Sequence, residues 1–190
     1  MSDDEKFLQH TIRVWVWGGF YDRERAAEHL EDLFTDDPEM AADRAAIEKA
    51  LAAEFAKKAT AEKTWPKETD CDRLDRVFEA LNAGGICALQ NAGYTQSDGF
   101  SDVSEVIHEQ GRENFRGYCF YHGQDLERAV NGRVLLLAFG DLDQSDAQSI
   151  AIARAIVDAL KKERFTATWD GSVKQRIDIR NMDWKRRTPR

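Results

Sequence analysis

The sequence has few cysteines and no long apolar run, and each shortage excludes a class of protein. Its three cysteines, Cys71, Cys87 and Cys119, are an odd number without C-x-x-C spacing. Neither a disulfide framework nor a zinc ribbon is therefore expected, and the thiols are predicted to be reduced and buried. No apolar segment reaches the length that spans a bilayer, and residues 1–6 are acidic and polar where a secretory signal would be basic and then apolar. These features predict a cytoplasmic protein that does not insert into a membrane.

Basic residues are fewer than acidic ones, which bears on the class of partner. The 190 residues include 27 lysines and arginines against 35 aspartates and glutamates, for a formal net charge of −8. Binding of nucleic acid requires a concentrated basic face, and the basic cluster in the sequence is Lys185, Arg186 and Arg187 with Arg190. We expect no nucleic-acid partner. The partner predicted instead is an unknown small molecule or protein.

Sequence motifs of cofactor and metal sites are missing as well. The chain has no G-x-x-x-x-G-K or G-x-G-x-x-G, the glycine-rich patterns that hold phosphates, and no H-E-x-x-H. His122 with Asp125 and Asp141, or His108 with Glu105, could supply metal ligands, but neither set has a diagnostic spacing. We predict neither a cofactor nor a metal.

The chain does contain enough apolar residues for a sizeable core, at 42% of its length, and its first third has helical patterns. Residues 21–34 repeat apolar side chains at helical spacing, while 3–17 also suit a strand but are assigned as helix. Asp37 as N-cap and Pro38 as first helical residue predict a third helix to about residue 63. Pro66 ends this region, so we predict an N-terminal helical region at 1–66 and an α/β domain with a C-terminal hairpin and basic tail at 67–190.

After this boundary, predicted strands and helices alternate. An amphipathic helix around 70–83 stops at two glycines, and residues 91–102 are predicted to form a loop. The further elements expected are strands at 86–90, 118–122 and 133–139, helices at 102–113 and 124–130, a long helix capped by Ser145, and a hairpin of 165–169 with 175–179. The fold class predicted is α/β, or α+β, with a mixed central sheet of about five strands and flanking helices.

Polar residues follow several of the predicted strands. If residues 118–139 form a right-handed parallel crossover, the carboxyl ends of its two strands share one edge of the sheet, where open α/β structures bind ligands. His122 and Asp125 would then lie beside Asp141, and the loop 91–98 would join them if the strand at 86–90 is parallel too. The sequence therefore predicts a polar cleft built from three loops.

Candidate roles in this cleft follow from side-chain chemistry. His122 is a candidate general base, with Asp125 or Asp141 to orient it, because a neighbouring carboxylate tunes a histidine across neutral pH. The alternative is a structural His122, hydrogen-bonded beneath a loop or capping the next helix. Cys119 is assigned to the core because a strand places it on the opposite face from His122. Candidate ligand-binding residues are Tyr94, Ser97, Asp98, Gln124 and Arg176, the last as a bidentate donor to an acidic group.

Several segments give the chain a resemblance to a known family. They are GYTQSDG at 93–99, GYCFYHGQDLE at 117–127 and TWDG at 168–171, followed by Arg176-Ile177, Trp184 and paired arginines. With these segments, roughly residues 70–187 resemble a bacterial domain family of unknown function. The resemblance supports the domain boundary and implies no activity and no catalytic residues.

Two classes of function remain open on the sequence. The first is an intracellular, non-catalytic binding or regulatory module that uses the polar cleft, which the acidic charge and the missing catalytic motifs favour. The alternative is a small hydrolase or transferase with His122 as general base. A His122 that contacts a carboxylate and faces an open pocket would favour the enzyme, whereas a buried His122 would oppose it.

Overall fold

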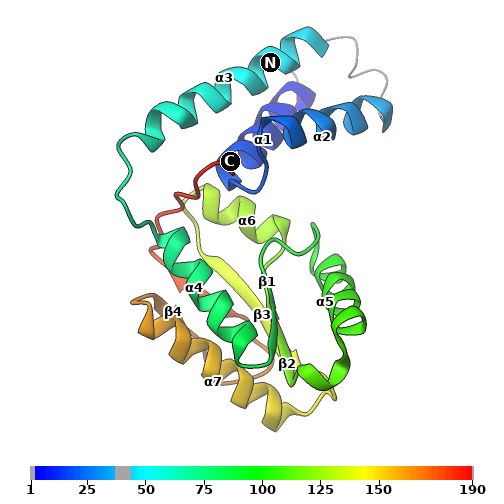
Figure 1. Cartoon of the computed structure of the whole chain (residues 1–190), viewed down its shortest axis with the longest axis vertical. Helices are drawn as coiled ribbons and strands as arrows, with labels where there is room; N and C mark the ends of the chain where they lie inside the picture. Colours follow the sequence, from blue (N-terminus) through cyan, green and yellow to red (C-terminus); the bar gives the residue numbers. More distant parts are fainter. Residues whose placement is uncertain (1–2, 37–43, 190) are drawn as a thin grey trace. The chain divides into compact units, whose positions relative to one another are not determined.

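We describe residues 3–36 and 44–189 of the chain from a computed structural model (Figure 1). The chain divides into two compact units, residues 1–69 with 185–190, and residues 70–184. The sequence analysis placed a boundary at residue 66 and assigned the basic tail to the second domain. In the structure, the tail belongs to the first unit.

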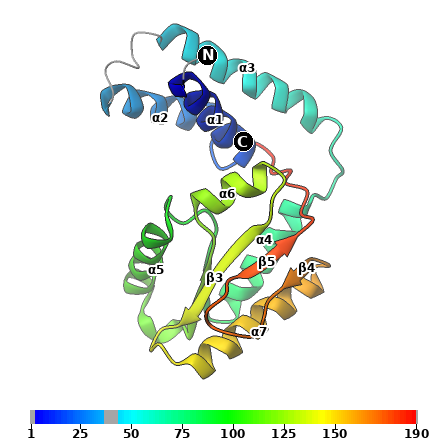
Figure 2. The same ribbon diagram turned by 180° about the vertical axis from the view of Figure 1, so that it is seen from behind.

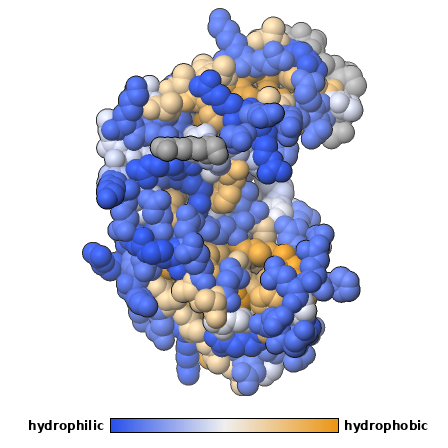
Figure 3. Space-filling view, viewed as in Figure 1, coloured by the Kyte–Doolittle hydropathy of each residue, from blue (hydrophilic) through white to orange (hydrophobic). Residues whose placement is uncertain are grey.

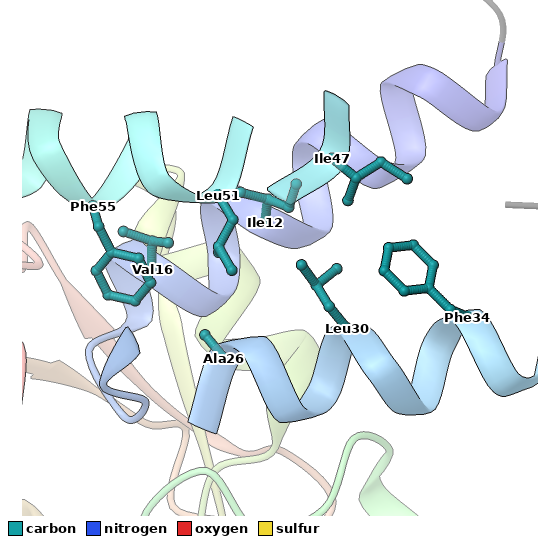
Figure 4. Packing of buried hydrophobic residues seen from close by; sticks show 8 residues of the cluster. All are labelled: Ile12, Val16, Ala26, Leu30, Phe34, Ile47, Leu51 and Phe55. Atoms are coloured by element: carbon teal, nitrogen blue, oxygen red, sulfur yellow. The ribbon is translucent and has the colours of Figure 1, made fainter. Parts of the chain in front are cut away.

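The first unit is built from α1 (Asp3–Gly18), α2 (Arg23–Asp36) and α3 (Arg44–Glu62). Each of these amphipathic helices turns an apolar stripe toward the other two, because helix formation alone stabilises a short helix too little in water. Figure 4 shows the side chains that meet between them: Ile12 and Val16 from α1, Ala26, Leu30 and Phe34 from α2, and Ile47, Leu51 and Phe55 from α3. The predicted start of the third helix at Asp37 and Pro38 lies outside the described residues.

The carboxyl-terminal tail is fastened to these helices by hydrogen bonds. Lys58 of α3 is fully buried, and its Nζ donates to the backbone carbonyl of Val16 in the last turn of α1 at 2.8 Å. Glu62, one turn later, accepts from the backbone N–H and the hydroxyl of Thr188 at 2.8 and 3.0 Å. Arg187 donates to the carbonyl of Pro66 at 2.6 Å. The last residues thus complete the first unit.

The second unit is an α/β structure, as the sequence predicts. Its described elements are α4 (Asp70–Ala83), β1 (Ile86–Leu89), α5 (Gln96–Gln110), the 3₁₀-helix η2 (Arg112–Asn114), β2 (Gly117–Phe120), α6 (Gly123–Val130), β3 (Leu135–Asp141), α7 (Asp146–Lys162), β4 (Thr166–Thr168) and β5 (Ile177–Arg180). The strands form a five-stranded mixed sheet in the order β1-β2-β3-β5-β4. The β1–β2 pair is parallel, and the other pairs are antiparallel.

Helices cover the two faces of this sheet unequally. Helices α4 and α7 pack on one face, in front of the strands in Figure 1, so that β3 and β5 lie in front of α4 when seen from behind in Figure 2. On the other face, Val103 of α5 packs with Cys87 of β1, Phe120 of β2 and Ala138 of β3. Gly99 allows this close approach, because a Cβ there would overlap the Phe120 ring.

The predicted crossover between the second and third strands is wrong. Strands β2 and β3 are antiparallel, with Gly117 opposite Asp141 and Phe120 opposite Ala138. Helix α6 has only eight residues, which span about 12 Å, whereas the seven residues of β3 span about 23 Å. The connection therefore does not carry the chain back to the start of β2, and β3 begins at the end of the sheet where β2 finishes.

The predicted start of α5 at residue 102 is also wrong, because the helix begins six residues earlier. Thr95 is the N-cap: its hydroxyl accepts from the N–H of Asp98 at 3.3 Å, and the Asp98 carboxylate accepts from the N–H of Thr95 at 2.8 Å. This reciprocal capping box was the signal for an earlier start. It turns the predicted loop into the first turns of a helix.

Hydrophilic side chains cover most of the visible surface of each unit, with smaller hydrophobic areas between them (Figure 3). Across the residues that the structure describes, none of the helices combines the length and the apolar character needed to cross a bilayer.

Candidate functional site

The parallel pairing of β1 and β2 brings two of the predicted loops together. Three backbone hydrogen bonds join them: Ala92 donates to the carbonyl of Tyr121 at 2.9 Å, Gly123 to that of Gly93 at 2.9 Å, and Gln124 to that of Tyr94 at 3.1 Å. Because both strands end at the same edge of the sheet, the chain after β1 runs beside the start of α6. The sequence prediction of a shared rim is correct for these two loops.

A buried cluster of three side chains lies at this rim. Asp125 Oδ2 is 3.0 Å from His122 Nε2 and 2.9 Å from Arg176 Nη1. The same carboxylate oxygen lies 3.5 Å from the backbone nitrogen of His122, and Arg176 Nη1 is 3.2 Å from His122 Nε2. Only 1% of the Asp125 side chain and 5% of the His122 side chain are exposed, against 30% of Arg176. Arg176 is thus the member of the cluster that solvent or a ligand can reach.

The distances assign the protons in this cluster. Nε2 of His122 and Oδ2 of Asp125 would repel each other through their lone pairs at 3.0 Å unless a proton lay between them. We therefore assign the Nε2–H tautomer to His122, which donates to Asp125, while Arg176 donates to the same oxygen. The guanidinium 2.9 Å away favours the carboxylate form of Asp125.

Burial shifts the pKa of both titratable partners toward their uncharged forms. It lowers the pKa of His122, and Arg176 lowers it further, while Asp125, the backbone of Tyr94 and Asp98 act in the opposite direction. It raises the pKa of Asp125 against the lowering effects of Arg176 and His122. Burial thus favours a neutral His122, whereas the contact with Arg176 favours an Asp125 whose charge balances the guanidinium.

The geometry of His122 bears directly on catalysis. Its Nε2 is engaged by Asp125, and its Nδ1 is buried in the protein. A general base must reach the proton of a bound substrate directly or through one water. Neither ring nitrogen is placed to do so in this conformation. His122 is therefore buried, and the sequence analysis stated that a buried His122 would oppose an enzymatic function.

A groove lies on the open part of the sheet beside this cluster, and we call it the β3–β5 groove. It has a volume of about 480 Å³ and extends from the start of α5 across β2 and β3 to the loop before β5. Leu136 and Ala138 of β3 and Tyr118 of β2 line it from the sheet, and Phe100 and Val173 stand at its sides. This volume lies within the range of small-molecule sites, which is about 300–1,000 Å³.

The polar residues of the groove include both signs of charge. Lys174 lies in the loop between β4 and β5, Arg176 is the residue just before β5, and Asp178 lies within β5. Asp178 also pairs with Arg180, at 3.4 Å. Because Asp125 balances Arg176, and Lys174 and Asp178 are opposite in charge, the groove is close to neutral in a chain whose formal net charge is −8.

Arg176 is anchored through one nitrogen only. In the described structure, its hydrogen bond runs from Nη1 to Asp125, and Nη1 also lies 3.2 Å from His122 Nε2. The Nε and Nη2 atoms, which form the side-on edge of the guanidinium, make no hydrogen bond to any described residue. That edge supplies parallel N–H donors with the spacing of a carboxylate. The buried Asp125 thus holds the guanidinium while leaving its bidentate edge unused.

The other ligand-binding candidates have mainly local roles. The Tyr94 hydroxyl donates to Glu127 of α6 at 3.0 Å, and burial together with this carboxylate raises the pKa of Tyr94. Asp98 caps α5, and the hydrogen bond from the Thr95 backbone lowers its pKa. Ser97 and Gln124 are exposed. These four side chains lie near the rim but do not line the β3–β5 groove.

Asp141 is not part of the cluster. It pairs with Gly117, at the opposite end of β2 from His122, because β2 and β3 are antiparallel. Its Oδ2 accepts from the backbone N–H groups of Asp143 and Ser145 at 2.9 and 3.1 Å, so it shapes the turn before α7. Asp141 cannot orient His122 from this position.

The sequence analysis missed most of the groove. Tyr118, Leu136 and Ala138 share one face of the sheet by their alternation along β2 and β3, but nothing in their pattern showed that α5 leaves part of this face uncovered. Phe100 was placed in a loop. Its exposure at 39%, unusual for a large apolar residue on a helix, is a property of the fold.

The cysteines and acidic residues offer no second reactive centre in the described structure. All three cysteines are buried and free of disulfides. Burial raises the pKa of Cys87 to about 11 and that of Cys119 further, so neither forms a thiolate near neutral pH. Among the described residues, no three His, Cys, Asp or Glu side chains are grouped as metal ligands.

Comparison with known proteins places the chain in a family without assigning it a role. No curated protein and no solved structure matches it. A family model does match and spans both units, so the family covers the N-terminal helices as well as the region from residue 70 that the sequence analysis recognised. The chain belongs to the family described as "Domain of unknown function (DUF6891)", which matches it over residues 1–188.

Proposed function

We propose that this protein is a non-catalytic binding module whose β3–β5 groove holds an anionic group of its ligand through Arg176. The observation that carries the proposal is that the Arg176 guanidinium is bonded through one side only. Its Nη1 donates to the buried Asp125, whereas its Nε–Nη2 edge makes no hydrogen bond to a described residue. A side chain held in this way loses little further conformational freedom when a ligand binds, which favours affinity.

A cytoplasmic location in a bacterium is part of the same proposal. It is supported by the three free, buried thiols, which persist in a reducing compartment, and by the resemblance to a bacterial family noted from the sequence.

The alternative function, a small hydrolase or transferase, rests on the His122–Asp125 contact of 3.0 Å, which resembles the pair of a base and its orienting carboxylate. The burial of both side chains opposes it, because a substrate would reach His122 only after the surrounding chain had moved. We therefore rank binding above catalysis.

The experiment that tests binding is an NMR titration of the ¹⁵N-labelled protein with small anionic, neutral and cationic fragments. Anionic fragments are expected to shift the Arg176 Nε–H signal and the amides of Leu136, Ala138 and Lys174. Arg176→Lys keeps the charge but removes the fork, and it should lose these shifts. Arg180→Lys, four residues further along the chain at the end of β5 and outside the groove, is the matched control that should retain them.

Two outcomes would contradict the proposal. One is a set of groove shifts that neutral and cationic fragments cause as strongly as anionic ones, and the other is anion binding that persists in Arg176→Lys. Hydrolysis of an activated ester that disappears in His122→Gln but not in Arg180→Lys would support the enzyme instead.

A further inference from the structure

The walls of the β3–β5 groove indicate more about its ligand than the charge of one group. Phe100 and Val173 keep 39% and 38% of their surfaces exposed, and both line this groove. Large apolar residues that stay exposed along one groove indicate that an apolar surface is covered on binding. The groove therefore suits a ligand with an apolar body as well as an anionic group.

The shape of the apolar part follows from the elements that present it. Leu136 and Ala138 line the groove from adjacent positions of one face of β3, and a sheet face is broad and shallow. The Phe100 ring meets those of Tyr118 and Phe120 edge to face, at centroid distances of 5.6 and 5.2 Å, which fixes its orientation at the side of the groove. A flat, rigid body fits between such a floor and such a wall.

The charges around Arg176 discriminate between anions. Asp125 lies 2.9 Å from the guanidinium, and Asp178 lines the same groove. These two carboxylates offset the positive charges of Arg176 and of Lys174, which also lines the groove, and so oppose a second negative charge on the ligand, whereas a single charge is matched by the Nε–Nη2 edge. A planar monoanion thus fits better than a phosphate monoester, which carries a charge between about −1.5 and −2 near neutral pH.

We infer that the ligand of the β3–β5 groove is a monocarboxylate with a flat apolar body, held by the Nε–Nη2 edge of Arg176 and covered by Phe100 and Val173. This inference rests on the proposed function and narrows it. The same chemistry is found in a free aromatic acid and in the carboxyl terminus of a peptide that ends in an aromatic residue.

The test compares probes that differ in one property at a time. Isothermal titration and NMR would be carried out with 2-naphthoate, its uncharged amide, 2-naphthyl phosphate and acetate. We expect 2-naphthoate to bind at least about tenfold more tightly than each of the other three, a factor within reach of one charged hydrogen-bonded pair or one buried ring system. N-acetylphenylalanine imitates the carboxyl terminus of a peptide. Tighter binding of N-acetylphenylalanine than of 2-naphthoate would indicate a peptide ligand, and the reverse order would indicate a free aromatic acid.

Variants separate the contributions of the groove residues. Phe100→Ala should weaken 2-naphthoate about fivefold or more and leave acetate unchanged, because only the apolar contact is lost. Asp178→Asn should reduce the difference in affinity between 2-naphthyl phosphate and 2-naphthoate, because it removes one negative charge that repels the phosphate. Arg176→Lys should lose binding of 2-naphthoate, and Arg180→Lys should keep it. Folding of each variant is checked by its dispersed amide spectrum.

The outcomes distinguish failure of this inference from failure of the proposed function. If 2-naphthyl phosphate binds more tightly than 2-naphthoate, or if acetate binds equally well, the groove remains an Arg176-dependent anion site but the ligand class is wrong. If the amide binds as tightly as the acid, or if no probe shifts the Arg176 Nε–H signal at about 10 mM, a concentration that detects even millimolar affinity, both are wrong.

Discussion

At the scale of single residues, Asp125 determines how the candidate site is held together. Its carboxylate is almost wholly buried and accepts from three N–H groups: the backbone N–H and Nε2–H of His122, and Nη1–H of Arg176. A buried charge is tolerated because these partners replace water, and the loss of the charge leaves them without compensation. The residue is therefore a positioning group for Arg176 and a source of local stability.

Asp125→Asn tests this role. The substitution keeps the shape but removes the charge, and we expect it to lower the free energy of opening of β2 and β3 by about 2 kcal/mol, because Arg176 remains partly hydrated in the variant. Hydrogen exchange of the strand amides measures that free energy. Asp158→Asn, on the exposed side of α7, is the control and should change it by less than about 0.5 kcal/mol. Equal effects of the two variants would contradict the assigned role.

The lowered pKa of His122 predicts a particular dependence of stability on pH. Below about pH 6.5, the ordinary value for histidine, the unfolded chain binds a proton that the folded protein resists, because burial lowers the folded pKa. The contribution of His122 to the free energy of unfolding is therefore complete above about pH 6.5, and it is lost as the pH falls through the pKa of the folded protein. The raised pKa of Asp125 has the opposite sign, because its folded form takes up a proton more readily than the unfolded chain.

His122→Gln removes the histidine part of this dependence. Between about pH 7.5 and pH 5.5, the free energy of unfolding of the wild type should fall more steeply than that of the variant, by up to about 1.4 kcal/mol per pH unit. Hydrogen exchange of β2 at several pH values, corrected for the intrinsic exchange rate, gives both slopes. Parallel slopes would mean that His122 titrates normally in the folded protein.

At the scale of elements, the close contact between α5 and β2 positions one wall of the groove. Gly99 lies in α5 against the ring of Phe120, and the next residue, Phe100, stands at the side of the β3–β5 groove. The helix can approach the strand this closely only because residue 99 has no side chain. The position of Phe100 therefore depends on its neighbour.

Gly99→Ala is expected to destabilise the second unit even though alanine favours helices. The gain in helix propensity is at most about 1 kcal/mol, whereas the added methyl group would overlap Phe120, and overpacking costs about 1–3 kcal/mol. Thermal unfolding followed by near-ultraviolet circular dichroism reports the net change. Ser101→Ala, exposed in the same helix, should be neutral or slightly stabilising, and a Gly99→Ala protein as stable as Ser101→Ala would contradict the packing argument.

The sequence predicted those features of these elements that a local pattern of residues determines, and it did not predict those that depend on contacts between distant segments. The helices α2, α4 and α7 and the strand β3 could be placed because their apolar spacing is strong over many residues. The direction of β3 could not, since the chain between it and β2 suits a turn-back as well as a short crossover. Asp141 was misplaced for that reason, whereas His122, Asp125 and the fork of Arg176 were proposed as candidates from their chemistry alone. The His122–Asp125 contact is local, but the contact with Arg176 joins residues 51 positions apart in the chain, and no local pattern predicts it.

At the scale of the whole molecule, the first unit is discontinuous in sequence. Residues 185–189 contribute contacts to helices that were formed by the beginning of the chain, including the Thr188–Glu62 hydrogen bonds and the Arg186 guanidinium over the Phe20 ring at 4.6 Å. The second unit takes no part in these contacts. Stability of the first unit should therefore depend on the last residues of the chain.

A chain that ends at Trp184 tests this dependence. We expect hydrogen exchange to become at least about tenfold faster in the carboxyl-terminal halves of α1 and α3, which corresponds to about 1.4 kcal/mol. Exchange in β1, β2 and β3 should remain unchanged. The single variant Thr188→Ala removes one of the tail's hydrogen bonds and should have a smaller effect in the same helices. Faster exchange in the strands as well would contradict the division into two units.

The division also has a consequence for the order in which the newly made protein can fold. The two ends of the second unit are joined, since the backbone N–H of Asp183 donates to Asp70 at 3.0 Å. During synthesis, the helices made first lack their contacts with Arg187 and Thr188 until more than a hundred further residues have been added. The amino-terminal helices therefore complete their hydrogen bonds only after the whole of the second unit has been synthesised.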